Sequence, residues 1–228
     1  LMIRRPPRST LSSSSAASDV YKRQQLDAAG RHPDVVCVFS DFRSFGPDRD
    51  PRLEQRPDYT SAPDYRTRML CEYSVLPSTA MVRASALDEL RFPVGITDSE
   101  DMIFFIELRK RGPFLRVPAP LVDYRILPDS AVRSAGHNLR SVRARHGYLR
   151  DHEDEYSEAE RREIREHLAE VLIRGHGRAL WRDRDPRMAR AYRRLFEEVR
   201  PADMPVPREF RRRLYPRWMY LVRDLLSS

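Results

Sequence analysis

The sequence is poor in lysine, in cysteine and in long apolar runs. Of its 42 basic residues only Lys22 and Lys110 are lysine, a skew that a GC-rich genome produces more often than an arginine-specific task does. Cys37 and Cys71 are the only cysteines. They lack metal-ligand spacing, so we expect reduced core residues of a cytosolic protein. No apolar run is long enough to span a bilayer. These absences exclude a disulfide scaffold and a bilayer-spanning helix within these residues.

Residues 1–24 differ from the rest of the chain. They contain a serine run and a proline pair, but no hydrophobic period and no continuous apolar core of the kind that a secretory signal needs. A basic, serine-rich transit peptide is one alternative. The stretch also resembles the translation of sequencing-adapter DNA, a contaminant at the ends of metagenome-derived reading frames. On that resemblance we expect residues 1–24 to be non-native and without a stable fold, and the true N-terminal part to be missing.

Charge is distributed unevenly along the chain. The formal net charge is +8, and residues 1–24 contribute +4 of it. Residues 25–200 carry 31 basic and 30 acidic side chains, so we expect no basic face there and no nucleic-acid partner. Residues 201–228 carry six arginines against three acidic residues. Most of the remaining positive charge therefore lies in the C-terminal segment.

Short segments of alternating type predict an α/β fold. Residues 35–39 form a continuous β-prone apolar run, which is typical of a strand buried on both faces. Residues 46–63 are rich in Pro, Asp and Arg and predict an irregular loop. A helix is expected over 64–73 and a short strand over 78–83. Two further strands are expected after the central helix, over 114–117 and 121–125, separated by prolines, and this order of strand, helix and strand implies an α/β sheet.

The central helix follows the acidic stretch Thr97–Asp101 and contains the apolar run Met102–Leu108. We expect Asp98 or Ser99 to cap its N-terminus and Gly112 to take a left-handed conformation after it. Its apolar residues lie on nearly all sides, which predicts a helix covered by its neighbours. Glu100 and Asp101 then emerge at its N-terminal end. The structural alternative is that these acids only cap the helix and complement its dipole.

Beyond about Ser134 the chain predicts charged, amphipathic helices that pack as an antiparallel group. Ser157 and Glu160 form a capping box, and Asp185 is an N-cap followed by proline at the first helical position. Residues 207–226 form a basic amphipathic stripe. Two interpretations of this stripe are open: it packs on the preceding helices, or it makes peripheral contact with an anionic membrane surface.

Four stretches together carry a family resemblance. They are HPDVVCVFSDF (32–42), PSTAMVRASALDEL (77–90), SEDMIFFIELRKRG (99–112) and VPAPLVDYRILPDS (117–130). In this order and spacing they resemble the second half of a family 2 glycosyltransferase of the GT-A fold. The resemblance implies a partial, Rossmann-like GT-A sheet over 25–134 that lacks its N-terminal half. A C-terminal α-helical extension would follow over 135–228.

The resemblance also implies a chemistry. In that family a nucleotide-sugar donor binds the first half of the domain, where an Asp-x-Asp motif holds a divalent cation, Mg²⁺ or Mn²⁺. The acidic pair of the later helix faces the acceptor hydroxyl. Glu100 and Asp101 match that pair, which assigns the general base to Asp101 and a supporting role in the acceptor site to Glu100.

The chain departs from the family pattern in two ways. The metal-binding Asp-x-Asp would lie upstream of Gln25, so the cation ligands are expected to be missing from this sequence. Leu127 stands where family members often have a histidine near the diphosphate. Arg125 is a candidate for donor binding, with a solvent-exposed strand end as the equal alternative. Asp41 is a second candidate because it lies at the expected end of a strand, where open α/β sheets place ligands.

These features predict an inverting glycosyltransferase of bacterial cell-surface polysaccharide synthesis. It would move a sugar from a nucleotide-sugar donor to a glycan or lipid-linked acceptor. We expect it to be cytoplasmic, in peripheral contact with the inner face of the membrane through 207–226, and inactive as a fragment. The alternative is a basic helical module that docks on membranes or proteins without catalysis. The histidines of the C-terminal region, His137 to His176, are expected to be surface residues.

Overall fold

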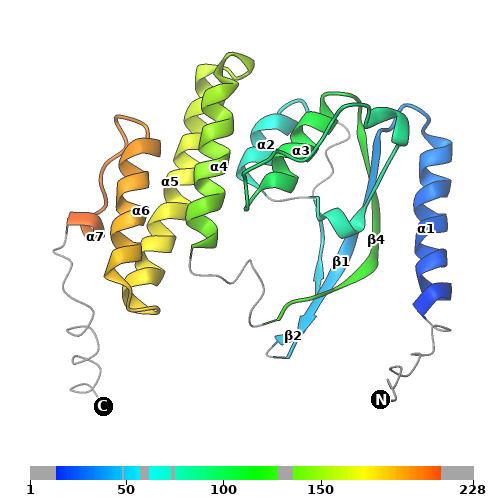
Figure 1. The fold of residues 1–228 in the computed structure, drawn as a ribbon, viewed down its shortest axis with the longest axis horizontal. Helices are drawn as coiled ribbons and strands as arrows, with labels where there is room; N and C mark the ends of the chain where they lie inside the picture. Colours follow the sequence, from blue (N-terminus) through cyan, green and yellow to red (C-terminus); the bar gives the residue numbers. More distant parts are fainter. Residues whose placement is uncertain (1–13, 48, 57–61, 73–74, 128–135, 212–228) are drawn as a thin grey trace, which may run out of the picture. The chain divides into compact units, whose positions relative to one another are not determined.

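The computed structural model describes residues 14–47, 49–56, 62–72, 75–127 and 136–211. The described part is mixed α/β, with a small open sheet and several helices (Figure 1). Its helices and strands are α1 (Ser14–Arg31), β1 (Cys37–Gly46), β2 (Arg49–Glu54), α2 (Tyr65–Cys71), β3 (Ala80–Val82), α3 (Glu100–Arg109), β4 (Phe114–Arg125), α4 (His137–Asp151), α5 (Glu158–Trp181), α6 (Pro186–Val199) and α7 (Arg208–Arg211).

The chain forms two compact units that do not follow chain order. The first contains the residues up to 61, with 75–88 and 109–125. The second contains 62–74, 89–108 and the residues from 126 onward. Helices α2 and α3 thus group with the C-terminal helices, whereas the sequence suggested one boundary near residue 134. We describe each unit by itself.

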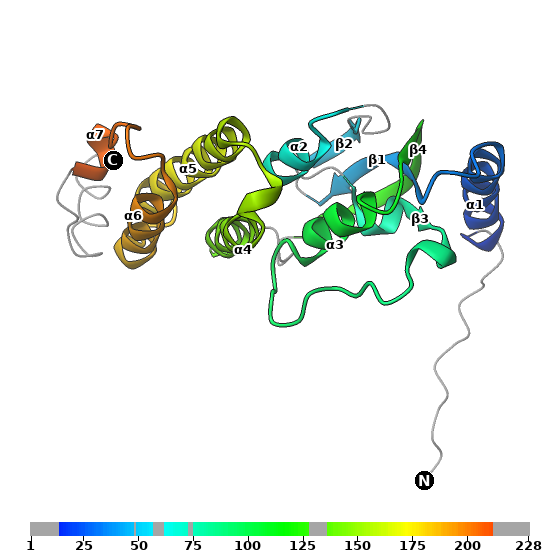
Figure 2. The same cartoon turned by 90° about the horizontal axis from the view of Figure 1, so that it is seen from above.

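Strand β1 is the centre of the sheet in the first unit. It pairs in parallel with β4, from Cys37 opposite Phe114 to Phe45 opposite Arg125. Its other edge pairs antiparallel with β3 and with β2. Helix α1 runs alongside β1 and β4 (Figure 2). Ala28 of α1 packs there with Val35 and Val38, which buries the start of β1 as its apolar run predicts.

Strand β4 is continuous, which corrects the expectation of two strands separated by prolines. The pairing of β1 with β4 shifts on both sides of Asp41, where Pro120 lies opposite it. Proline has no N–H to donate and is tolerated in a strand at such irregularities. Pro118 and Pro120 therefore mark a bulge inside one strand and do not end it.

The expected loop over 46–63 contains strand β2, a second correction. β2 forms a hairpin with the end of β1, and Ser44 Oγ donates to Glu54 Oε1 at 2.9 Å. Among the described strands β2 pairs only with β1, so Pro51 needs no partner on its far side. The polar composition misled the prediction because an exposed edge strand needs little apolar content.

Helix α1 begins at Ser14, so residues 14–24 are helical although we expected no stable fold before residue 25. Five of these eleven residues are Ala, Lys, Arg or Gln, which favour helix, and the stretch contains no proline or glycine. Gln25 then anchors the helix, because its side-chain amide donates to the Thr79 carbonyl oxygen at 2.7 Å. Residues 1–13 lie outside the described part.

Gly112 is needed for close packing, which corrects its expected role. Its backbone does not adopt positive φ; among the described glycines only Gly95 does. A Cβ atom at Gly112 would lie 2.5 Å from Cγ1 of Val36 and 3.3 Å from the Asp34 carbonyl oxygen. The segment that leads into β1 therefore leaves no room for a side chain at position 112.

The second unit is built on α4, α5 and α6, which lie side by side (Figure 1). The predicted capping box at Ser157 is present, and Asp185 caps α6 by accepting from the N–H groups of Arg187 and Met188. Buried side chains of α5 and α6 form the core between them: Ile164, Leu168, Leu172, Tyr192, Leu195, Phe196 and Val199. Helix α3 buries residues on nearly all sides, as predicted: Met102, Ile103, Phe104, Phe105, Ile106 and Leu108.

Only the first residues of the C-terminal stripe are described. Phe210 is fully buried, and its ring lies 4.7 Å from that of Phe196 and 4.3 Å from that of His176. At this residue the stripe packs on the preceding helices. The rest of 207–226, beyond Arg211, lies outside the described residues.

Two glycines of α5 provide a matched test of this packing. A Cβ atom at Gly175 would overlap the ring of Tyr192, whereas at Gly177 it would meet nothing within 4 Å. Replacing glycine by alanine inside a helix stabilises by about 0.5–1 kcal/mol where space allows. We expect Gly177→Ala to raise the free energy of unfolding by that amount. Gly175→Ala should lower it by roughly 1–3 kcal/mol through overpacking. Denaturant titration measures both, and equal stabilisation by the two variants would contradict the described contact of α5 with α6.

Candidate functional site

The acidic pair lies in the first turn of α3, where the sequence predicts it. Glu100 and Asp101 are both half-buried. Asp101 Oδ1 accepts a hydrogen bond from the backbone N–H of Met102 at 2.8 Å, which orients the carboxylate at the end of the helix. The N-terminal end of α3 therefore presents two carboxylates on a helix whose remaining residues are packed.

The residues before this pair tie α3 to α4. Ser99 occupies the N-cap position, since its carbonyl oxygen accepts from the N–H of Ile103. Its hydroxyl does not cap the helix as expected, but lies 2.6 Å from that of Ser141 in α4. Asp98 is only 6% exposed, and its carboxylate contacts His137 Nδ1 and Arg140 Nε, again from α4. His137 is thus half-buried and contacts the Asp98 carboxylate, although the sequence suggested a surface histidine.

Ser99 has a φ of 70°, in the left-handed region that non-glycine residues rarely adopt. Such a conformation costs about 1–3 kcal/mol and persists where surrounding contacts determine it. Here the bonds of Asp98 and Ser99 to α4 supply those contacts. Strain of this kind is frequent at functional sites, and it lies directly before Glu100 and Asp101.

Asp41 does not lie at the end of a strand, because β1 continues to Gly46. Its side chain is buried, with 2% of the residue exposed. Both of its carboxylate oxygens accept from Arg116 of β4, at 2.9 and 2.6 Å, and Oδ1 also accepts from the N–H of Arg56. These contacts give Asp41 a structural role where β1 and β4 shift register, and they correct its expected position at a strand end, whereas its role in donor binding stays a prediction.

Arg125 is the last residue of β4, and its side chain is exposed. Its guanidinium lies 5.6 Å from the centre of the Phe45 ring, a cation–π distance. Arg125 and Asp41 belong to the first unit, whereas Glu100 and Asp101 belong to the second. The predicted site residues therefore fall into two groups, one in each unit.

The divalent cation that the resemblance implies has no fitting ligand set in this part of the chain. Among the described residues, no three His, Cys, Asp or Glu side chains gather as metal ligands. The carboxylates of Asp41 and Asp98 are both occupied by arginines. We therefore assign no chemical step here to a cation.

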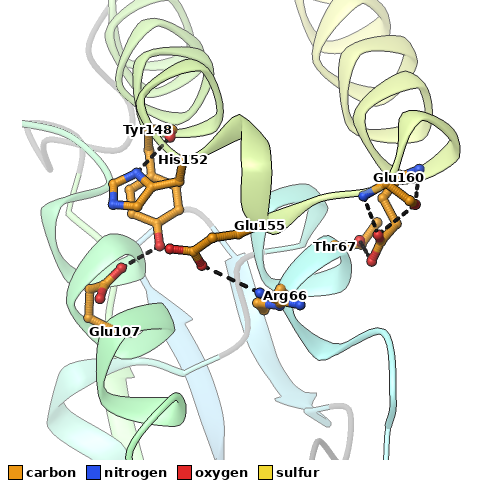
Figure 3. Close-up of polar contacts among 8 residues, drawn as sticks. Arg66, Thr67, Glu107, Tyr148, His152, Glu155 and Glu160 are labelled. Carbon is orange, nitrogen blue, oxygen red and sulfur yellow. Dashed lines mark hydrogen bonds and ion pairs between the residues drawn. The ribbon is translucent and has the colours of Figure 1, made fainter.

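A pocket that sequence reasoning missed lies between α3 and α4 and has a volume of about 450 Å³. Ile103, Phe104 and Glu107 line it from α3, and α4 contributes Tyr148. Figure 3 shows the Tyr148 hydroxyl directed at Glu107, to which it donates a hydrogen bond, and the His152 ring beside Tyr148. The two rings stack with centroids 4.1 Å apart. Burial and then the bond to Glu107 raise the pKa of Tyr148, which stays protonated as a donor.

Local sequence gives no signal for this pocket. Glu107 and Tyr148 are 41 residues apart and come from helices that the sequence placed in different domains. The pocket depends on the long-range placement of α4 against α3, which hydrophobic periodicity does not predict.

Within the described residues, no helix combines the length and apolarity needed to cross a bilayer.

His176 of α5 is buried, which corrects its prediction as a surface residue. It is 1% exposed, and neither ring nitrogen has a hydrogen-bond partner among the described residues. It continues the spacing of four from Leu168 and Leu172, so the α5 period itself indicates a core position. Burial, reinforced by the nearby Arg193, lowers the pKa of His176 to about 4.

No protein-family model matches the chain, and no curated protein sequence is recognisably similar to it.

The buried His176 predicts a pH-dependent stability. Its pKa is about 4 in the folded chain against about 6.5 when unfolded. The unfolded state therefore binds the proton first, and the stability present above pH 6.5 is lost as pH falls toward 4. The loss reaches roughly 3 kcal/mol at most. His176→Leu should remove this contribution. The free energy of unfolding of the variant, relative to that of the unchanged protein, should therefore rise as pH falls. Denaturant titrations between the two pH values measure the difference, and parallel pH profiles would contradict a buried, neutral imidazole.

Proposed function

We propose that this chain is the acceptor-side part of an inverting glycosyltransferase. It would transfer a sugar from a nucleotide-sugar donor to a glycan or lipid-linked acceptor, in bacterial cell-surface polysaccharide synthesis on the cytoplasmic side of the membrane. The proposal is carried by the acidic pair of α3, which lies half-buried at a helix end held by α4. The four stretches that resemble family 2 enzymes support it, and the mixed α/β sheet is compatible with a partial GT-A fold.

The proposed reaction is a direct displacement. The acceptor hydroxyl oxygen attacks the anomeric carbon, the bond from that carbon to the diphosphate breaks, and the hydroxyl proton passes to Asp101. A general base requires a carboxylate held within hydrogen-bond reach of that proton. The bond from the Met102 N–H orients Asp101 for this role. Glu100, one residue earlier, would accept a hydrogen bond from another acceptor hydroxyl.

Asp101→Asn provides the test in the full enzyme. Loss of a general base lowers turnover by roughly 10²–10⁴-fold, whereas donor binding should be nearly unchanged. Initial rates of sugar transfer and donor titration measure the two effects separately. Asp123→Asn is a matched control, since Asp123 is exposed on β4. Near-normal turnover in Asp101→Asn would mean that the acidic pair only caps α3.

One observation favours the second function, docking on an anionic membrane surface. The exposed face of α6 carries four arginines whose guanidinium groups make no ion pair or hydrogen bond with other described side chains: Arg187, Arg190, Arg193 and Arg194. Trp181, at the end of α5, is 42% exposed. Arginines with an exposed tryptophan suit the interface of an anionic bilayer.

The order of charged residues along α6 destabilises this helix. Arginines occupy the first turns, and the exposed acids Glu197 and Glu198 lie in the last turn. The helix dipole favours the opposite order, and Arg190 and Arg194 are a like-charged pair at a spacing of four. An external anionic partner would compensate both unfavourable terms.

Vesicle co-sedimentation tests this second function. The triple variant Arg187→Gln, Arg190→Gln and Arg194→Gln should bind phosphatidylglycerol vesicles more weakly. The expected loss of binding free energy is about 1 kcal/mol for each arginine at low salt. The matched control changes Arg162, Arg174 and Arg178 to Gln, because these α5 arginines are exposed and already paired with acids. Equal losses in both triple variants would indicate a general charge effect and would contradict a docking face on α6.

A further inference from the structure

An apolar loop leads into α3. Between Glu89 and Asp98 the chain has no acidic residue, and Phe92, Val94 and Ile96 occupy alternate positions. Figure 2 shows this stretch as an open loop beside α3. Val94 is fully exposed and Phe92 is 49% exposed, whereas only two other large apolar side chains are exposed in the described part of the second unit. Apolar side chains that gather on one loop indicate a contact surface.

The backbone of this loop is held at both ends. The Phe92 ring stacks on that of Phe104 in α3, with centroids 4.3 Å apart and planes 10° from parallel. Val94 and Gly95 form a turn, in which Gly95 has a φ of 83° that favours glycine. The loop then ends at Asp98, whose carboxylate α4 binds. Fixed points on both sides of the turn therefore hold Val94 outward in solvent.

Arginines surround the base of the loop. Loop residues line two pockets, one of about 450 Å³ and one of about 240 Å³, and Arg143 of α4 lines both. Arg91 joins it in the larger pocket and Arg140 in the smaller one, and all three arginines are exposed. The acids that line these pockets already have hydrogen-bond partners: Asp98, Glu107 and Asp151. The loop therefore presents an apolar tip with basic side chains behind it.

We propose that this tip inserts into the interface of an anionic bilayer, with Val94 deepest and Arg91 and Arg143 at the level of the lipid headgroups. Apolar side chains partition into the boundary between headgroups and acyl chains, and nearby basic residues add attraction to anionic lipids. A protruding side chain needs a matching cavity on a protein partner, whereas lipids rearrange around it. The inference rests on the proposed docking on anionic membranes, to which it adds a contact separate from α6.

Insertion of the loop would bring the acidic pair close to the membrane surface. Val94 precedes Glu100 by six residues, and six extended residues span at most about 20 Å. Of the two acceptor classes proposed for the transferase, a lipid-linked acceptor would then present its sugar within reach of Asp101. This choice of acceptor rests on the proposed transferase, but insertion of the loop does not.

Val94→Asp tests insertion by co-sedimentation with phosphatidylglycerol vesicles. Because Val94 is fully exposed, the variant should fold as the unchanged protein does. We expect it to bind vesicles roughly tenfold more weakly or worse, since it loses apolar contact and gains a negative charge at the lipid surface. Leu53→Asp is the matched control, because Leu53 of β2 is 48% exposed and the change in charge is the same. Its binding should be almost unchanged.

A fluorescent label reports insertion without relying on a loss of binding. Val94→Cys in a Cys71→Ser background accepts an environment-sensitive dye, since Cys37 is only 1% exposed. On phosphatidylglycerol vesicles its emission should shift to the blue, and lipids that carry a quencher near the headgroup should quench it. The same label at Leu53→Cys should show neither effect. Equal emission at the two sites would overturn the proposal.

The vesicle assays separate this inference from docking through α6. If Val94→Asp binds as the unchanged protein does, or if Leu53→Asp loses as much, the loop does not insert, and the α6 variants decide docking by themselves. If the α6 triple variant binds normally and Val94→Asp does not, the loop stands and the role of α6 falls. Absence of binding by the unchanged protein overturns both. Sedimentation velocity without lipid tests the other occupant: a dimer that Val94→Asp dissociates would mean that a second copy covers the loop, and would overturn the proposal.

Discussion

The second unit depends on how Asp98 is neutralised. This carboxylate is almost fully buried, and Arg140 and His137 of α4 both contact it. The Arg140 side chain is itself 44% exposed, so solvent screens this pair, and its removal costs less than the roughly 3–5 kcal/mol typical of a fully buried pair. Asp98 must therefore face α4, and Ser99 takes a left-handed backbone in the position that follows. Helix α3 then begins at Glu100, with the acidic pair at its end.

The contacts of Asp98 also help to explain why a pocket lies between α3 and α4. α4 is held to α3 near its start by Asp98 and near its end by the bond from Tyr148 to Glu107. Between these two ties α4 contributes Ala144 and Gly147, which are too small to fill the space. Two fixed ends and small residues between them leave a pocket whose width is set by the polar contacts. The stability of this helix pair and its pocket therefore depend on the same contacts.

Local signals predicted the helices well and the sheet poorly. The capping box at Ser157 and the N-cap Asp185 were visible because capping needs only residues three or four apart. Strand β2 and the continuity of β4 through Pro118 and Pro120 depend on pairing with β1, which is far away in the sequence. In the candidate site, Glu100 and Asp101 were located from a motif, whereas the wall that α4 contributes is a long-range feature.

The acidic residues of this chain differ in role according to the arginines that reach them. Asp41 and Asp98 both follow apolar or loop segments that suggested other functions, yet Arg116 occupies the first and Arg140 the second. Those arginines lie 75 and 42 residues further along the chain. Asp101 Oδ1 accepts a hydrogen bond from the adjacent backbone N–H of Met102. The high arginine content therefore bears first on folding, by neutralising buried acids. The arginines on the outer face of α6 have no such acidic partner among the described side chains, which is why the proposed membrane contact rests on them.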